Sequence, residues 1–118
     1  MADENNEISA EDAYIAKLVG QVKDKCRITW EDEATERVIR DELVPTACSV
    51  IRFKVGIPDD AEFDFSEPGL EHRLFLNLCY YAWHDAEDDF ERNYAADLAH
   101  ARRVWEVRND AEGQEGSS

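Results

Sequence analysis

The sequence predicts an all-α protein, a small bundle of four helices with flexible termini. Apolar residues recur at three- and four-residue spacing along most of the chain, and no stretch shows the two-residue alternation of a strand. The 118 residues suit a single domain. We expect a flexible acidic N-terminus over residues 1–8, a helical domain over 9–108 and a flexible tail over 109–118.

The first predicted helix covers residues 10–26. Ser9, with Asp12 three positions later, resembles a capping box, in which the two side chains bond the free backbone N–H groups at the start of a helix. The apolar stripe that follows consists of Ile15, Leu18, Val19, Val22 and Cys26. Ser9 is therefore the expected N-cap.

The second predicted helix starts at Thr29 to Asp32, which repeats the same start signal, and ends near Gly56. Trp30 is expected just inside its first turn. Pro45 removes one backbone donor and crowds the preceding turn, yet the helical period resumes directly after it. We therefore predict a kinked second helix.

Residues 57–67 form a predicted acidic loop before the central helix. Phe63 and Phe65 alternate with acidic residues there. The loop is long for a connection between two helices of a small bundle, and such loops are often functional. The two phenylalanines are expected to fix it to the core or to a neighbouring molecule.

The central helix is predicted over residues 68–83, with Ser66 as its N-cap and Pro68 at an early position. This stretch is apolar around most of its circumference, so the other helices should pack around it. Glu71 and Arg73 in its first turns, together with its short length, argue against a membrane span.

The fourth predicted helix covers roughly residues 88–108. Its apolar positions repeat at three or four residues and are Phe90, Tyr94, Leu98, Ala101 and Trp105. The acidic cluster that separates it from the central helix contains no proline or glycine. Whether the third and fourth helices are continuous therefore stays open.

The chain is strongly acidic, with 28 acidic and 13 basic residues and a formal charge of −15. This balance argues against a protein that holds nucleic acid by neutralising phosphates. The start of the chain has no secretory signal pattern, so we expect a cytoplasmic protein. Cys26, Cys48 and Cys79 lie singly on apolar helix faces, as buried free thiols do in a reducing compartment.

No catalytic pattern is evident, and no cofactor is expected. The pairs Glu33/Glu36 and Asp85/Asp88 have the spacing of the magnesium-binding carboxylates in all-α nucleotide pyrophosphohydrolases, although such pairs also arise by chance in an acidic chain. One Asp-x-x-His pair, at residues 97–100, is an incomplete form of a di-metal bundle motif. Solvated helix faces explain these residues without a metal.

One basic and aromatic cluster lies near the end of the fourth helix. It consists of Arg102, Arg103, Trp105, Val107 and Arg108. Arginine and tryptophan are enriched at interface hot spots, whereas a core tryptophan beside arginines that suit the helix dipole is the structural alternative. The sequence leaves both interpretations open.

The order of these elements resembles the head–tail connector (adaptor) family of tailed phages and of prophages in Gram-positive bacteria. The resemblance covers about residues 12–108. Its most specific parts are residues 28–32, 56–60 and 65–78, and the order of elements continues through SEPGLEHRLFLNLC to a last helix that ends in VWEV. Neither the acidic N-terminal extension nor the segment after Asn109 belongs to it.

The resemblance implies a structural virion protein at the head–tail interface, present in the host cytoplasm during assembly, with no enzyme activity. Such subunits self-associate, usually as twelve copies, into a ring under the portal protein. The ring extends the DNA channel and offers a platform to a stopper or tail-completion protein. Double-stranded DNA then passes without specific binding, because acidic surfaces facing the channel repel phosphates.

The resemblance also places portal binding at the C-terminal segment, here the cluster Arg102, Arg103, Trp105, Val107 and Arg108. A head-to-tail ring needs two exposed patches on different sides of the subunit. The candidates are Phe63 and Phe65 on one side, for contacts with a subunit or the tail, and the outer faces of the second and fourth helices on the other. The alternatives are the magnesium-dependent pyrophosphohydrolase and a monomeric acidic protein-binding module.

Overall fold

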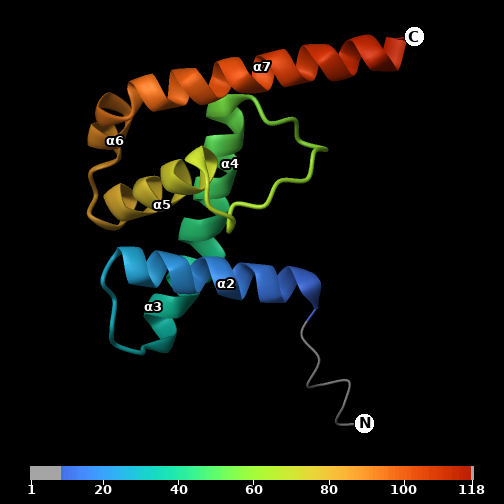
Figure 1. Cartoon of the computed structure of the whole chain (residues 1–118). Coiled ribbons are helices and arrows are strands. Elements are labelled where there is room, and N and C mark those ends of the chain that lie inside the picture. Colours follow the sequence, from blue (N-terminus) through green and yellow to red (C-terminus); the bar gives the residue numbers. More distant parts are fainter. Residues whose placement is uncertain (1–8, 118) are drawn as a thin grey trace, which may run out of the picture.

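The structure, a computed structural model, describes residues 9–117, and the expected flexible segment 1–8 lies outside this part. The described residues are helical or in loops, without a strand. The helices follow in the order α2 (Ala10–Lys25), α3 (Glu33–Val38), the π-helix η1 (Ile39–Leu43), α4 (Val44–Val55), α5 (Leu70–Trp83), α6 (Glu87–Asn93) and α7 (Ala95–Ser117) (Figure 1). The all-α prediction is confirmed.

The start of α2 agrees with the predicted cap. The backbone N–H of Asp12 donates to Ser9 Oγ at 3.0 Å, which satisfies one free donor of the first turn. Leu18, Val19 and Val22 then face the core. The first helix therefore forms where its sequence signals place it.

The second helix begins later than expected. Asp32 is its N-cap and accepts hydrogen bonds from the backbone N–H and the hydroxyl of Thr35, at 2.9 and 2.8 Å. Trp30 lies before the helix and is 51% exposed. The predicted start at Thr29 was therefore wrong, because the carboxylate of Asp32 is the stronger acceptor for the N–H groups of the first turn.

The second helix is not one α-helix kinked at Pro45. Its path runs through α3, η1 and α4, and Pro45 occupies the first turn of α4. The N–H of Val44 bonds the carbonyl of Ile39, five residues back, which is the spacing of a π turn. The missing donor and the crowding by the proline ring are thus accommodated by a wider turn directly before it.

The loop after α4 begins at Gly56, whose φ of +84° is the left-handed conformation that glycine adopts without a side-chain clash. The central helix then starts at Leu70 and has Gly69 as its N-cap. Ser66 is therefore not the N-cap, and Pro68 precedes the helix. Ser66 instead bonds Asp64 within the loop through its backbone N–H and its hydroxyl.

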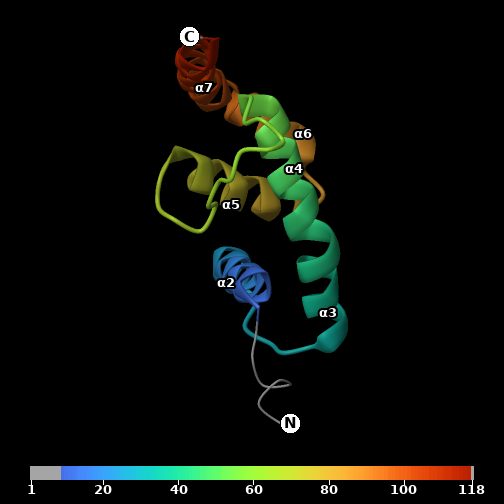
Figure 2. The ribbon, with the colours of Figure 1, turned by 90° about the vertical axis from the view of Figure 1, so that its right-hand side faces the viewer.

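The helix α5 is central, as predicted. It contacts α2, α4, α6, α7 and η1. Figures 1 and 2 show α2, α5 and α7 one above another, with the path from α3 to α4 crossing them on one side. The core side chains of α5 are Leu74, Phe75, Leu78 and Cys79. The apolar circumference of this segment thus matches its position between α2 and α7 and against α4.

The third and fourth predicted helices are separate, and the fourth is itself divided. Asp85 has a φ of +57° in the turn between α5 and α6, and Tyr94 breaks the helix again before α7. The helix α7 continues to Ser117 instead of ending near residue 108. Part of the segment expected as a flexible tail is therefore helical.

The protein is flat. Its extents are 50 × 42 × 20 Å, and its radius of gyration is 16.4 Å, against about 13 Å expected for a compact domain of this length. Figure 2 shows the narrow profile. A thin body of this kind leaves large areas of α4 and α7 at the surface.

Candidate interaction surface

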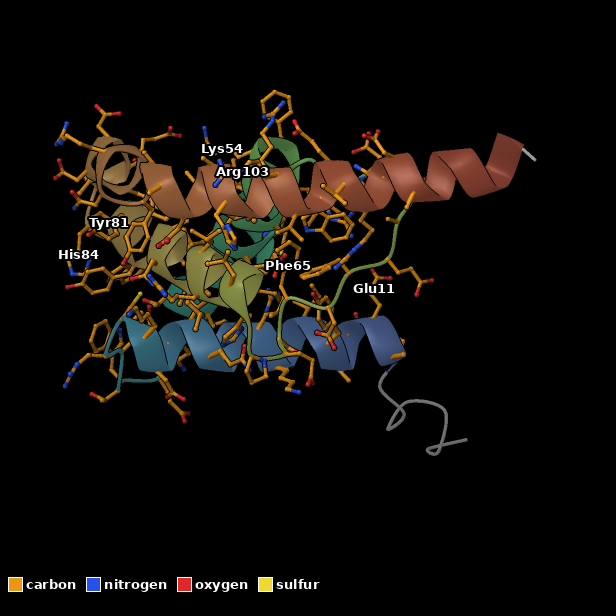
Figure 3. All side chains as sticks on the ribbon, turned by 45° about the horizontal axis from the view of Figure 1, so that its top comes forward. Glu11, Lys54, Phe65, Tyr81, His84 and Arg103 are labelled. Carbon is orange, nitrogen blue, oxygen red and sulfur yellow. The ribbon has the colours of Figure 1, made fainter. Side chains whose placement is uncertain are left out.

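The acidic loop is fixed to the bundle through Phe65, which is 1% exposed. Its backbone N–H donates to the hydroxyl of Tyr14 at 2.9 Å, and its carbonyl accepts from His72 Nδ1 at 2.6 Å. Its ring lies 5.7 Å from that of Phe75 and points into the bundle (Figure 3). Burial raises the pKa of Tyr14. Phe65 is thus a core residue and offers no surface to a partner.

Phe63 links the loop to the C-terminal helix. Its ring lies edge-on to Phe65 at 4.9 Å and to Trp105 at 5.7 Å between ring centroids. Phe63 is partly buried, so only part of it faces solvent. Both phenylalanines that were predicted to form an interface attach the loop to the core.

The C-terminal cluster divides into buried and exposed members. Trp105 is 5% exposed, and its indole N–H donates to Glu71 Oε2 at 3.0 Å. Arg102 donates to the carbonyl of Lys54 at 3.3 Å, which ties α7 to the end of α4. Asn109 makes a similar tie to the carbonyl of Gly56 at 3.1 Å. These residues hold α7 on the bundle.

The rest of the cluster, together with Val104, forms what we call the α7 strip, made of Arg103, Val104, Val107 and Arg108. These residues are exposed, with Val104 at 40% and Val107 at 70%. Their three- and four-residue spacing makes them neighbours along the helix. The guanidinium of Arg108 lies 4.3 Å from the centre of the Trp105 ring. Among the described residues, neither arginine of the strip has an ion-pair partner.

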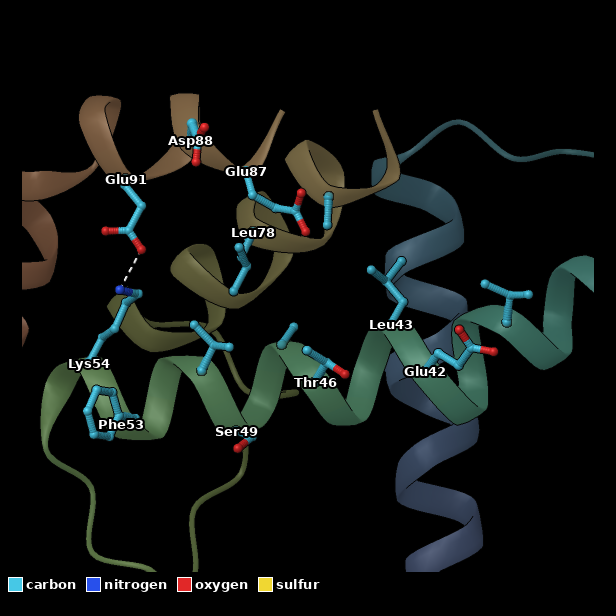
Figure 4. Close-up of a pocket in the computed structure, with 14 residues that line it drawn as sticks. Glu42, Leu43, Thr46, Ser49, Phe53, Lys54, Leu78, Glu87, Asp88 and Glu91 are labelled. Carbon is cyan, nitrogen blue, oxygen red and sulfur yellow. Dashed lines mark ion pairs between the residues drawn. The ribbon is translucent and has the colours of Figure 1, made fainter. Parts of the chain in front are cut away.

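A second surface feature is a groove of about 730 Å³ along α4, which we call the α4 groove (Figure 4). It lies between α4 and α6, with the end of α5 behind it. Its apolar lining comes from Val38, Leu43, Ala47, Val50, Leu78 and Ala82. Phe53 stands at this surface with 82% of its area exposed. Its exposure was not predicted from the sequence.

The border of the α4 groove is acidic. Glu42 from η1 and Glu87, Asp88 and Glu91 from α6 line it (Figure 4). Glu91 pairs with Lys54 at one end of the groove. The other three carboxylates make no ion pair with a described residue. The groove therefore combines an apolar floor with an excess of negative charge.

The carboxylates of the pyrophosphohydrolase hypothesis serve separate purposes. Glu36 accepts a hydrogen bond and an ion pair from Lys23 at 2.9 Å. Asp88 lies on the border of the α4 groove, and Asp85 lies in the preceding turn. Among the residues whose side chains the structure describes, no three acidic, histidine or cysteine side chains gather as a metal site would require. The spacing in the sequence thus does not bring these groups together.

The three cysteines are free thiols, with Cys26 and Cys79 buried and Cys48 partly buried. Burial raises the pKa of Cys48 to about 11 and also raises the pKa of Cys26 and of Cys79. A thiolate is the reactive form of cysteine, so none of these groups is an activated nucleophile. Their contribution is to core packing.

No protein-family model, curated protein or solved structure matches the chain. In the part of the chain that the structure describes, no helix combines the length and apolar character needed to cross a membrane.

Proposed function

We propose that this protein is a head–tail connector of a tailed phage, a structural subunit that assembles into a ring under the portal protein. The observation that carries the proposal is a flat subunit with two exposed patches of different chemistry, the α4 groove with its acidic border and the α7 strip with its two arginines. Exposed apolar patches of this kind mark association surfaces. Two different patches on one chain suit head-to-tail assembly into a closed ring.

We assign the portal contact to the part of α7 that follows Asn109, which lies next to the cluster to which the resemblance assigns it and beyond the residues that the resemblance covers. Figure 1 shows this end of the helix continuing past the rest of the bundle. In contrast, Trp105 and Arg102 within the expected portal-binding cluster are used to hold α7 on the body of the protein. A projecting helix end reaches a partner above the ring without disturbing that packing.

The acidic excess supports a role as a conduit. With a formal charge of −15 per chain, a ring presents negative charge to any DNA inside it. Repulsion of phosphates prevents tight binding, so DNA slides through the channel. The stopper or tail-completion protein then meets the opposite side of the ring.

The test is light scattering after size-exclusion chromatography, for the full chain alone and mixed with the portal protein of the same genome, at low and at physiological salt. A portal-dependent ring complex is expected. A chain that ends after Asn109 should fold, because it keeps the Trp105 and Asn109 contacts, but should not join the complex. Circular dichroism checks its folding.

A matched control is a chain without residues 2–8. That deletion removes three acidic residues, Asp3, Glu4 and Glu7, and truncation after Asn109 also removes three. The control should still form the complex. If the full chain ignores the portal in every condition, the connector function is wrong, whereas a complex formed by the chain ending at Asn109 contradicts the assigned contact alone.

A further inference from the structure

We propose that the α7 strip of one subunit occupies the α4 groove of the next subunit in the ring. This proposal rests on the proposed function, since it specifies the contact between the copies of that ring. The occupant of the groove is thus a second copy of this chain.

The two surfaces match in chemistry. The strip has two exposed valines, Val104 and Val107, beside two arginines that have no ion-pair partner among the described residues. The groove has an apolar floor, and three carboxylates of its border, Glu42, Glu87 and Asp88, have no ion-pair partner among the described residues. Arginine forms strong, directed hydrogen bonds with carboxylates. Docking would bury the valines against the floor and pair both sets of charges.

The geometry suits a helix lying in a groove. Arg103 and Val107 are one turn apart, as are Val104 and Arg108, so the strip presents successive side chains along one side of α7. Leu98, Ala101 and Trp105 face the bundle and leave this side free. The length of the groove, from Val38 in α3 to Lys54 at the end of α4, accepts several turns.

The distribution of charge also disfavours a symmetric contact in which groove meets groove. A two-fold contact of groove with groove would place the carboxylates on the groove border against one another. Like charges that meet in an interface are strongly unfavourable. A strip-to-groove contact avoids this repulsion and leaves a pair of subunits with one unused groove and one unused strip, which further subunits fill until the ring closes.

Chemical cross-linking between engineered cysteines tests the contact. One chain carries Phe53→Cys at the groove, and a second chain, with a size tag, carries Val107→Cys on the strip. Both positions are highly exposed, so neither substitution disturbs the core. The full-length chains are mixed in equal amounts, with and without the portal protein, and treated with a short bis-maleimide. Wild-type protein measures the background from the native thiols.

The expected result is a cross-linked heterodimer in a yield about tenfold or more above that of a control pair, Ala13→Cys with Val107→Cys. Ala13 is exposed on α2, outside the groove. Phe53→Cys alone and Val107→Cys alone should give no homodimer above background, because groove does not meet groove and strip does not meet strip. A chain carrying both substitutions should give a ladder of multimers.

A charge substitution provides an independent readout. Arg103→Glu in the Val107→Cys chain should lower the heterodimer yield about tenfold, the size expected for one lost charge-assisted contact. Arg27→Glu makes the same change in net charge at an exposed turn away from both surfaces and should leave the yield unchanged. Equal losses for the two variants would overturn the assigned contact in favour of a general charge effect.

The remaining outcomes separate the contact from the function. If the portal-dependent ring forms but Phe53→Cys and Val107→Cys cross-link no better than the control pair, the contact is wrong and the connector function stands. If the pair cross-links but no portal complex forms, the contact stands and the connector function is wrong. If neither occurs, both are wrong.

Discussion

Replacement of Phe65 by alanine tests whether this residue is an anchor of the core or part of an interface. Phe65 is 1% exposed and packs against Phe63 and Phe75. Removing a buried phenylalanine side chain costs about 3–5 kcal/mol, from lost burial and from the cavity that remains. With a urea dependence of about 2 kcal/mol per molar, a loss of about 4 kcal/mol lowers the midpoint of unfolding by about 2 M.

The assay is urea unfolding followed by tryptophan fluorescence and by circular dichroism. Of the three tryptophans, Trp105 contributes a signal from the loop, because Phe63 lies against both Phe65 and Trp105. The matched control is Phe53→Ala, the same substitution at a side chain that is 82% exposed. It should change the free energy of unfolding by no more than about 0.5 kcal/mol. Equal effects of the two substitutions would refute the assignment of Phe65 to the core and of Phe53 to the surface.

Three further predictions concern a hydrogen bond, a thiol and a helix cap. Trp105→Phe should lower the free energy of unfolding by about 1–2 kcal/mol in the urea assay, because the Glu71 carboxylate loses its indole donor; no change would show that the bond contributes nothing. Cys48, with its pKa raised to about 11 against an ordinary value of 9.0, should react about a hundredfold more slowly than an exposed thiol with an aromatic disulfide reagent at pH 8, and rapid reaction in native protein would contradict its burial. Hydrogen bonds from Thr35 lower the pKa of Asp32, so its stabilising effect should be complete above the ordinary carboxyl pKa of 3.8 and be lost as the pH falls through the lower folded-state value; Asp32→Asn, which keeps an acceptor, should remove this part of the pH dependence of unfolding.

The sequence predicted the helices where local signals and apolar spacing agree. Ser9 caps α2, Gly56 ends α4, and the apolar segment from Leu70 to Trp83 forms the central helix. These positions depend on neighbours within a few residues. The helix is interrupted at Asp85 and again at Tyr94, and neither interruption involves a proline or glycine. The sequence therefore had no local signal for the separation of α5, α6 and α7.

The surfaces were harder to predict because they depend on which side of a helix faces the bundle. Trp105 and Val107 lie close together in the sequence, yet one is buried and the other is 70% exposed. Phe65 is an aromatic residue in an acidic loop, as an interface residue could be, but its side chain is buried in the core beneath the loop. Phe53 lies off the stripe of Ile51 and Val55, and this is the signal that would have identified an exposed aromatic residue.

The net negative charge of each subunit opposes the assembly of the proposed ring. Subunits of charge −15 repel at long range, and this repulsion is reduced but not removed within a screening length of about 8 Å at physiological ionic strength. The α7 strip relieves it locally, because Arg103 and Arg108 lie where the acidic border of the α4 groove would meet them. Such contacts act only once subunits are aligned. A portal that holds the C-terminal ends of α7 side by side would raise the effective concentration of strip beside groove, so assembly would occur on the portal in preference to free solution.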